Sequence, residues 1–173
     1  MNMAAAYKIT SDPFFVNGNV TQTVLNTFEQ LEISLPLDSL QQEGILVHAV
    51  YWTSTEPESV AAVSSKVDLQ ISSTTKTGIV SANDANLVSR REVVITGGAL
   101  EFSGPHVNDF IGSEAPYQLA DNLMLIATDN VFLGINSSNQ VATLHQGFFR
   151  MVCSRIRLTA SAYAAMVTNE LSS

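Results

Sequence analysis

The sequence is poor in charged side chains, which make up 14% of its 173 residues against about 25% in an average soluble domain. Serine, threonine, asparagine and glutamine take their place, so we expect a surface that is polar but mostly uncharged. Uncharged side chains cost less to desolvate than charged ones, which favours a surface that neighbouring proteins cover. Extracellular β proteins share this composition, and that alternative stays open.

Basic residues are especially scarce, with 8 Lys and Arg against 16 Asp and Glu and a net charge of −8. Within residues 1–60 the only base is Lys8. The densest basic group is Arg150, Arg155 and Arg157, at odd and even positions that face opposite sides of a strand. A basic arm that could neutralise nucleic-acid phosphates is therefore excluded, and we expect no direct contact with nucleic acid.

Cysteine and histidine are also rare. Cys153 is the single cysteine, so no disulfide forms within the chain, and its apolar neighbours predict an inert thiol in the core. The three histidines, His48, His106 and His145, are far apart and lack the spacing of metal ligands. We predict a hydrogen-bonded histidine at position 48 and neither a metal site nor a cofactor.

Motifs for catalysis and targeting are missing as well. The chain has no Gly-x-Ser-x-Gly elbow and no phosphate-binding loop, and we predict no catalytic residues and no enzyme activity. A hydrolase using a pair among Glu101, Asp109 and Glu114 stays a third interpretation. We expect no secretory signal or membrane-spanning segment, because the longest apolar stretch is too short to cross a bilayer.

What the sequence does contain is alternation of apolar and polar residues with a period of two. Val67, Leu69 and Ile71 share one face of a predicted half-buried strand, and residues 31–35 alternate in the same way. The stretch 45–53 is apolar at nearly every position, which is typical of a central strand covered on both faces. Further strands are expected at 20–28, 93–96, 123–128, 131–135, 141–144 and 147–159.

Turn and helix signals complete the expected layout. Asn17-Gly18 favours a tight hairpin, and Asp129-Asn130 a second one. Residues 97–116 resemble a long irregular loop. Helices are expected only at 81–91 and 160–171. We therefore predict an all-β chain: one domain over residues 1–173, a single eight-stranded jelly roll (a Greek-key β-sandwich or barrel) with little helix.

The strand layout, with a central strand at 46–52 (LVHAVYW) and a long closing strand at 148–158 (FFRMVCSRIRL), resembles a known family. It is similar to the small major capsid protein of tailless, icosahedral bacteriophages that contain an internal membrane, as in Thermus phages. The members of that family are single upright jelly rolls. The resemblance implies a virion subunit, made in the host cytoplasm, that packs side by side with itself and with a larger capsid protein over the membrane. The lack of a basic arm agrees, since a membrane would separate this shell from the genome.

Residues 1–19 could form an N-terminal arm that crosses to another subunit. The candidates for subunit contacts there are Tyr7, Ile9, Phe14, Phe15 and Val16. The alternative for this segment is a strand in the chain's own sheet.

The main rival function is a β-sandwich module that binds a ligand or receptor, such as a lectin, through loops 54–59 and 97–116. Aromatic residues could supply a surface for a sugar or a partner, although the core is the more usual place for aromatics in strands. These residues are Tyr51, Trp52, Tyr117, Phe148 and Phe149.

Overall fold

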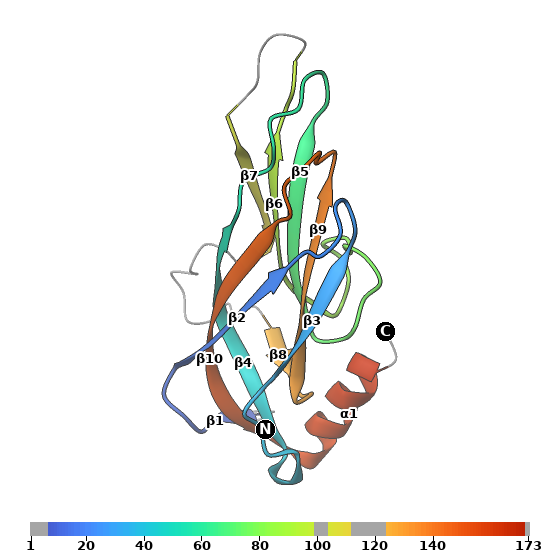
Figure 1. Cartoon of the computed structure of the whole chain (residues 1–173). Coiled ribbons are helices and arrows are strands. Elements are labelled where there is room, and N and C mark those ends of the chain that lie inside the picture. Colours follow the sequence, from blue (N-terminus) through green and yellow to red (C-terminus); the bar gives the residue numbers. More distant parts are fainter. Residues whose placement is uncertain (1–6, 99–103, 112–123, 172–173) are drawn as a thin grey trace.

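The computed structural model describes residues 7–98, 104–111 and 124–171. Within them, ten strands form two antiparallel sheets that face each other in an elongated sandwich (Figure 1). The remaining elements are the helix α1 (Ala160–Leu171) and a short 3₁₀ turn, η1 (Ser39–Gln41).

Sheet A has the strand order β1-β10-β4-β8, and β2 also pairs with β10. Its strands are β1 (Tyr7–Ile9), β2 (Phe14–Thr21), β4 (Glu43–Ser54), β8 (Met124–Ile126) and β10 (Gln146–Leu158). The short strand β1 and the longer β2 pair with successive parts of the same edge of β10. Residues 7–21 thus contribute two strands to the chain's own sheet.

Sheet B has the order β3-β9-β5-β6-β7. Its strands are β3 (Glu29–Ser34), β5 (Ser65–Ser72), β6 (Leu87–Ile95), β7 (His106–Ile111) and β9 (Asn130–Ser138).

The pairing of early with late strands defines the topology. β2 pairs with β10, β3 with β9, β4 with β8, and β5 with β6. In sequence, each pair lies between the two strands of the pair before it. A long hairpin folded over into two facing sheets has this pairing, which defines the jelly roll. The predicted fold is confirmed; β1 and β7 are additions to its eight strands.

Several local predictions were wrong. Asn17 and Gly18 do not form a turn: they lie inside β2, opposite Arg150 and Phe149 of β10. The expected strand at 20–28 ends at Thr21.

Other local predictions were wrong further along the chain. Residues 141–144 form a loop, and β6 begins inside the expected helix 81–91. At Asp129-Asn130 the chain passes from sheet A to sheet B without making a hairpin. Of the two predicted helices, only the one at 160–171 is confirmed. In the failed cases, long-range pairing overrides a local signal.

The core lies between the sheets and is built from alternate residues of their strands. Val67, Leu69 and Ile71 point into it as predicted, and the rings of Trp52 and Phe149 meet there with centroids 6.2 Å apart. The other face of β5 is buried too, which the prediction of a half-buried strand missed. The side-chain amide of Gln70 there contacts the loop that follows β5.

Gly147 allows β10 to approach β5 closely, because a Cβ at this position would collide with the Leu69 side chain. Replacing Gly147 with valine is expected to lower the free energy of unfolding by about 1–3 kcal/mol through overpacking. Urea unfolding checks this. The matched control is Gly78→Val, since Gly78 has open space around its Cα; equal losses in both variants would contradict the packing argument.

Helix α1 packs over the lower part of sheet A. It contacts Leu46 of β4 and Ile156 and Leu158 of β10, next to core-facing residues of the same strands. Near its end, the buried Glu170 carboxylate accepts the backbone N–H groups of Ala127 and Thr128, at 2.9 and 3.1 Å. Among the described residues, no helix has the length and hydropathy needed to cross a membrane.

Candidate interaction surface

Among the described residues, the outward face of sheet A is open around Phe148–Val152 of β10. On β10, Phe149, Met151 and Cys153 belong to the core, so the alternate residues Phe148 and Arg150 face outward. The flanking strands add further residues in register. Arg150 lies between Asn17 of β2 and Tyr51 of β4, and Val152 lies opposite Phe15.

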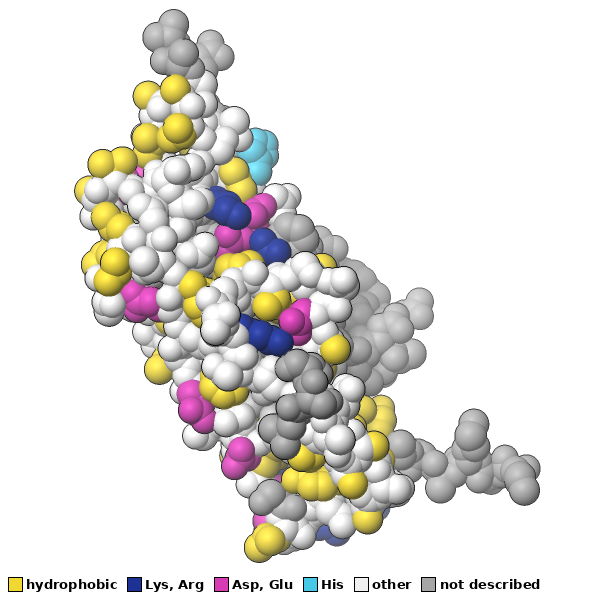
Figure 2. All heavy atoms as spheres, turned by 90° about the vertical axis from the view of Figure 1, so that its right-hand side faces the viewer, with side chains coloured by type: hydrophobic (Ala, Val, Ile, Leu, Met, Phe, Trp, Pro, Cys, Tyr) yellow, Lys and Arg dark blue, Asp and Glu magenta, His cyan; other side chains and the backbone are white. Residues whose placement is uncertain are grey.

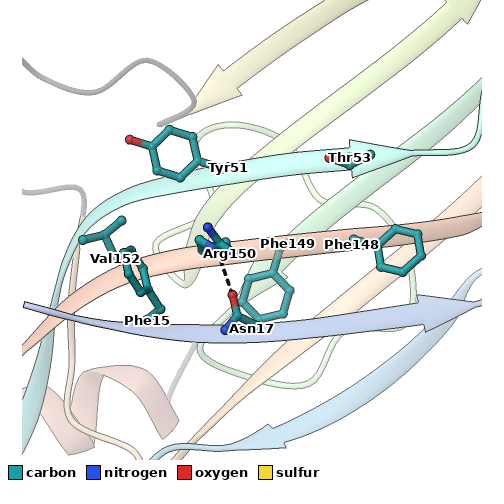
Figure 3. Close-up of a pocket in the computed structure, with 8 residues that line it drawn as sticks. All are labelled: Phe15, Asn17, Tyr51, Thr53, Phe148, Phe149, Arg150 and Val152. Atoms are coloured by element: carbon teal, nitrogen blue, oxygen red, sulfur yellow. Dashed lines mark hydrogen bonds between the residues drawn. The ribbon is translucent and has the colours of Figure 1, made fainter.

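These residues line an open groove of about 730 Å³, which we call the A-face groove (Figure 3). Its lining consists of Phe15, Asn17, Tyr51, Thr53, Phe148, Phe149, Arg150 and Val152. Three of its rings are exposed: Phe15 to 60%, Tyr51 to 48% and Phe148 to 42%. Large apolar side chains gathered on one face of a soluble domain typically mark a binding site.

Among the described residues that line the groove, Arg150 is the only charged one. Its guanidinium carbon lies 5.2 Å from the centroid of the Phe15 ring, and its Nε donates a hydrogen bond to Asn17 Oδ1 at 3.2 Å. No ion pair to Arg150 occurs in the described part of the chain. Within the described residues, the groove therefore presents a cation that stacks on an aromatic ring and has no carboxylate partner.

A second organised region joins two loops just beyond the C-terminal end of β4. Both oxygens of Glu58 accept backbone N–H groups of Val141, Ala142 and Thr143. Hydrogen bonds from the Thr143 hydroxyl and from these backbone groups lower the pKa of Glu58 to about 2. The loop at 54–59, expected to hold a ligand, is thus tied to the loop before β10.

Two of the three histidines lie within hydrogen-bond distance of hydroxyl groups. His48 is half-buried, with Nε2 2.9 Å from Ser154 Oγ, so the prediction of a hydrogen-bonded histidine is confirmed. His145 is buried, with Nδ1 3.0 Å from Thr55 Oγ1, and burial lowers its pKa. Over the ranges that the structure describes, no group of three His, Cys, Asp or Glu residues could hold a metal ion.

The predicted inert thiol is confirmed at Cys153, where burial raises the pKa to about 12. Of the three acids proposed for a hydrolase, Asp109 lies in β7, whereas Glu101 and Glu114 lie outside the described residues.

No family model matches the chain, and no curated protein matches it. Among solved structures, it is similar to VP1 of Trichodysplasia spinulosa-associated polyomavirus, solved in complex with 3'-sialyllactose. The likeness covers 88% of this chain and 97% of that chain, with 5% sequence identity and a TM-score of 0.42. Similarity at this level carries no argument about function, and the jelly-roll assignment rests on the strand pairing.

The five predicted contact residues lie in different environments. Phe15 lines the groove, and Ile9 is 50% exposed on β1. Phe14 and Val16 pack into the core, and Tyr7 packs near α1. The structure brings only Phe15 into the groove, and contact of any of the five with another subunit stays a prediction.

Most of the groove did not follow from the sequence. The core is the favoured place for strand aromatics, and Trp52 and Phe149 lie there; Tyr51 and Phe148 are exposed, as the alternative of a binding surface requires. Tyr117 lies outside the described residues. Strict alternation along 148–152 was the signal that could have separated Phe148 and Arg150 from Phe149.

Proposed function

We propose that the chain is a structural subunit of an icosahedral virus capsid and that the A-face groove is one of its subunit contacts. The observation that carries the proposal is the groove itself, where three exposed rings lie on one sheet beside an arginine that has no ion pair among the described residues. Interfaces between proteins are enriched in aromatic residues and arginine, and buried anchors of these types supply most of the binding energy.

In the fuller form of the proposal, the subunit packs side by side with copies of itself and with a larger capsid protein over an internal membrane of the virion. The elongated sandwich supports lateral packing, because its broad faces lie along its length (Figure 1). The low charge of the sequence supports the same arrangement, since few charged groups need to be desolvated. A net charge of −8 is consistent with a subunit that does not touch the genome.

The first test is light scattering behind size exclusion over a range of protein concentrations. We expect concentration-dependent dimers or larger species. A Phe15→Ser/Tyr51→Ser variant should associate at least about tenfold more weakly, because each removed ring is an anchor of the contact. Leu40→Ser, which changes an apolar residue that is 94% exposed outside the groove, is the matched control. A wild-type protein that stays monomeric at every concentration would contradict the proposal.

The second candidate is a lectin-like binding module. The size of the A-face groove favours it, since 730 Å³ lies within the usual range for small-ligand pockets. Aromatic rings beside an amide and a guanidinium could bind a sugar by stacking and hydrogen bonds. A lectin-like module is predicted to be a monomer that binds an oligosaccharide. The same light-scattering experiment therefore distinguishes it from a capsid subunit.

A further inference from the structure

The opposite side of the sandwich carries a surface whose charge complements that of the A-face groove. On β3 and β9, Ile33 and Leu133 belong to the core, so the alternate residues Glu32 and Phe132 face outward. They lie opposite each other in register. We call this surface the B-face patch; it comprises Glu32, Ser34, Asp129, Asn130 and Phe132.

The acids of the B-face patch have no cation partner. Glu32 and Asp129 are exposed and make no ion pair within the residues described. Glu32 accepts one hydrogen bond, from Asn130 Nδ2 at 2.7 Å, which fixes the carboxylate beside Phe132. The patch thus combines an oriented acid with an aromatic ring.

The other bases near this side are already occupied. Lys66 and Arg90 pair with Asp68 and Glu92, and Lys76 pairs with Asp84. Figure 2 shows this side of the molecule, where acidic side chains along the left edge lie apart from the few Lys and Arg side chains. A cation that pairs with the patch would therefore come from another molecule.

The A-face groove and the B-face patch also lie at the same position along the long axis of the sandwich. A Cβ on Gly18 of β2 would collide with the Ile33 side chain of β3, so these two positions face each other across the core. Glu32 precedes Ile33, and Asn17, the partner of Arg150, precedes Gly18. A neighbouring copy that stands beside the first in the same orientation can therefore bring Glu32 level with Arg150.

A symmetric contact between two A-face grooves fits the charges poorly. It would bring two Arg150 guanidinium groups together with no acid among the residues that line the groove. Desolvating like charges without a partner is costly. The charges favour a head-to-tail contact, which uses different surfaces on the two copies and can continue from one copy to the next.

We propose that the A-face groove of one copy binds the B-face patch of a second copy, with Glu32 of one chain paired to Arg150 of the other. This inference rests on the proposed function, because it names the partner of the same groove. Phe132 of the patch packs among the exposed groove rings, which shield the ion pair from water. A planar guanidinium that binds a carboxylate through two hydrogen bonds fixes the register of neighbouring copies.

The experiment is a charge swap followed by light scattering or sedimentation velocity over a range of concentrations. Arg150→Glu and Glu32→Arg should each weaken self-association by at least about tenfold, because each sets like charges against each other. The double variant Arg150→Glu/Glu32→Arg should return to within about threefold of the wild-type affinity, since it rebuilds the pair in reverse. Both residues are exposed, so the variants are expected to fold.

Matched controls carry the same charge changes elsewhere on the surface. Lys8→Glu and Glu56→Arg alter exposed residues outside both surfaces and should leave the affinity unchanged. If the wild type associates but the single variants have no effect, or the double variant is not restored, this contact is wrong and the subunit role stands. A strictly monomeric wild type overturns both. A monomer that binds an oligosaccharide through Arg150 would assign the groove to a glycan instead.

Discussion

Replacement of Leu69 by alanine is expected to lower the free energy of unfolding by about 2–5 kcal/mol, the usual cost of a cavity in a tight core. Leu69 is fully buried in the middle of β5, where β6 and β9 pair on either side. Across the core it faces Gly147, which has no side chain that could move into the space. The cavity therefore stays open.

Urea unfolding measures this loss, and Leu40→Ala is the matched control. Leu40 is 94% exposed, so the same change there should alter stability by less than about 0.5 kcal/mol. The double variant Leu69→Ala/Gly147→Ala tests the contact directly, because the new methyl group at position 147 enters the space that Leu69 leaves. It should be more stable than Leu69→Ala alone. Independent, additive effects would show that the two positions are not in contact.

The sequence predicted the positions of the central strands, although it missed that β5 is buried on both faces and that Tyr51 of β4 is exposed. The apolar stretch of β4 and the alternation in β5 have no competing local structure. The prediction for the N-terminal strand was wrong because a local turn signal competes with the strand there. In isolation the dipeptide Asn17-Gly18 favours a turn, but in the fold every residue of β2, these two included, pairs with β10. The glycine there serves close packing, since a Cβ would collide with Ile33 and Phe149.

The A-face groove could not be assembled from the sequence, because it depends on the register of three strands. Arg150 meets Asn17 and Tyr51 only through the pairing of β10 with β2 and β4, which are remote in sequence. The β4–β10 pairing also shifts register between Val152 and Cys153, and no residue pattern announces such an irregularity. Alternation could identify which residues face outward, but not which ones meet.

After the loss of Leu69, the second large effect is expected from acidification, which should destabilise the protein through the contact between Glu58 and the loop at 141–143. The hydrogen bonds from Thr143 and Val141 hold the folded pKa at about 2, below the ordinary value of 4.5. Above pH 4.5 the carboxylate is charged in both states and its full contribution is present. As the pH falls from 4.5 towards 2, the unfolded chain takes up a proton that the folded chain resists, and the contribution is lost.

His145 acts in the same direction at higher pH. Burial lowers its pKa from the ordinary value of 6.5, although the Glu58 carboxylate opposes part of that shift. Below pH 6.5 the unfolded chain binds a proton on this histidine more readily than the folded chain does, so stability falls. Loss of stability should therefore begin below about pH 6.5 and continue to pH 2.

Unfolding free energies between pH 7.5 and 2.5 measure the contributions of Glu58 and His145. Amide exchange at Val141, Ala142 and Thr143 reports on the Glu58 contact. Glu58→Gln keeps the shape of the side chain but cannot ionise, so it should exchange faster in this loop at pH 7 and lose less stability between pH 4.5 and 2. His145→Gln should flatten the decline just below pH 6.5. The control Glu56→Gln changes an exposed neighbour and should follow the wild type. A Glu58→Gln variant with the wild-type pH profile would rule out this loop contact as the source, because no other carboxylate holds the loop at 141–143 among the described residues.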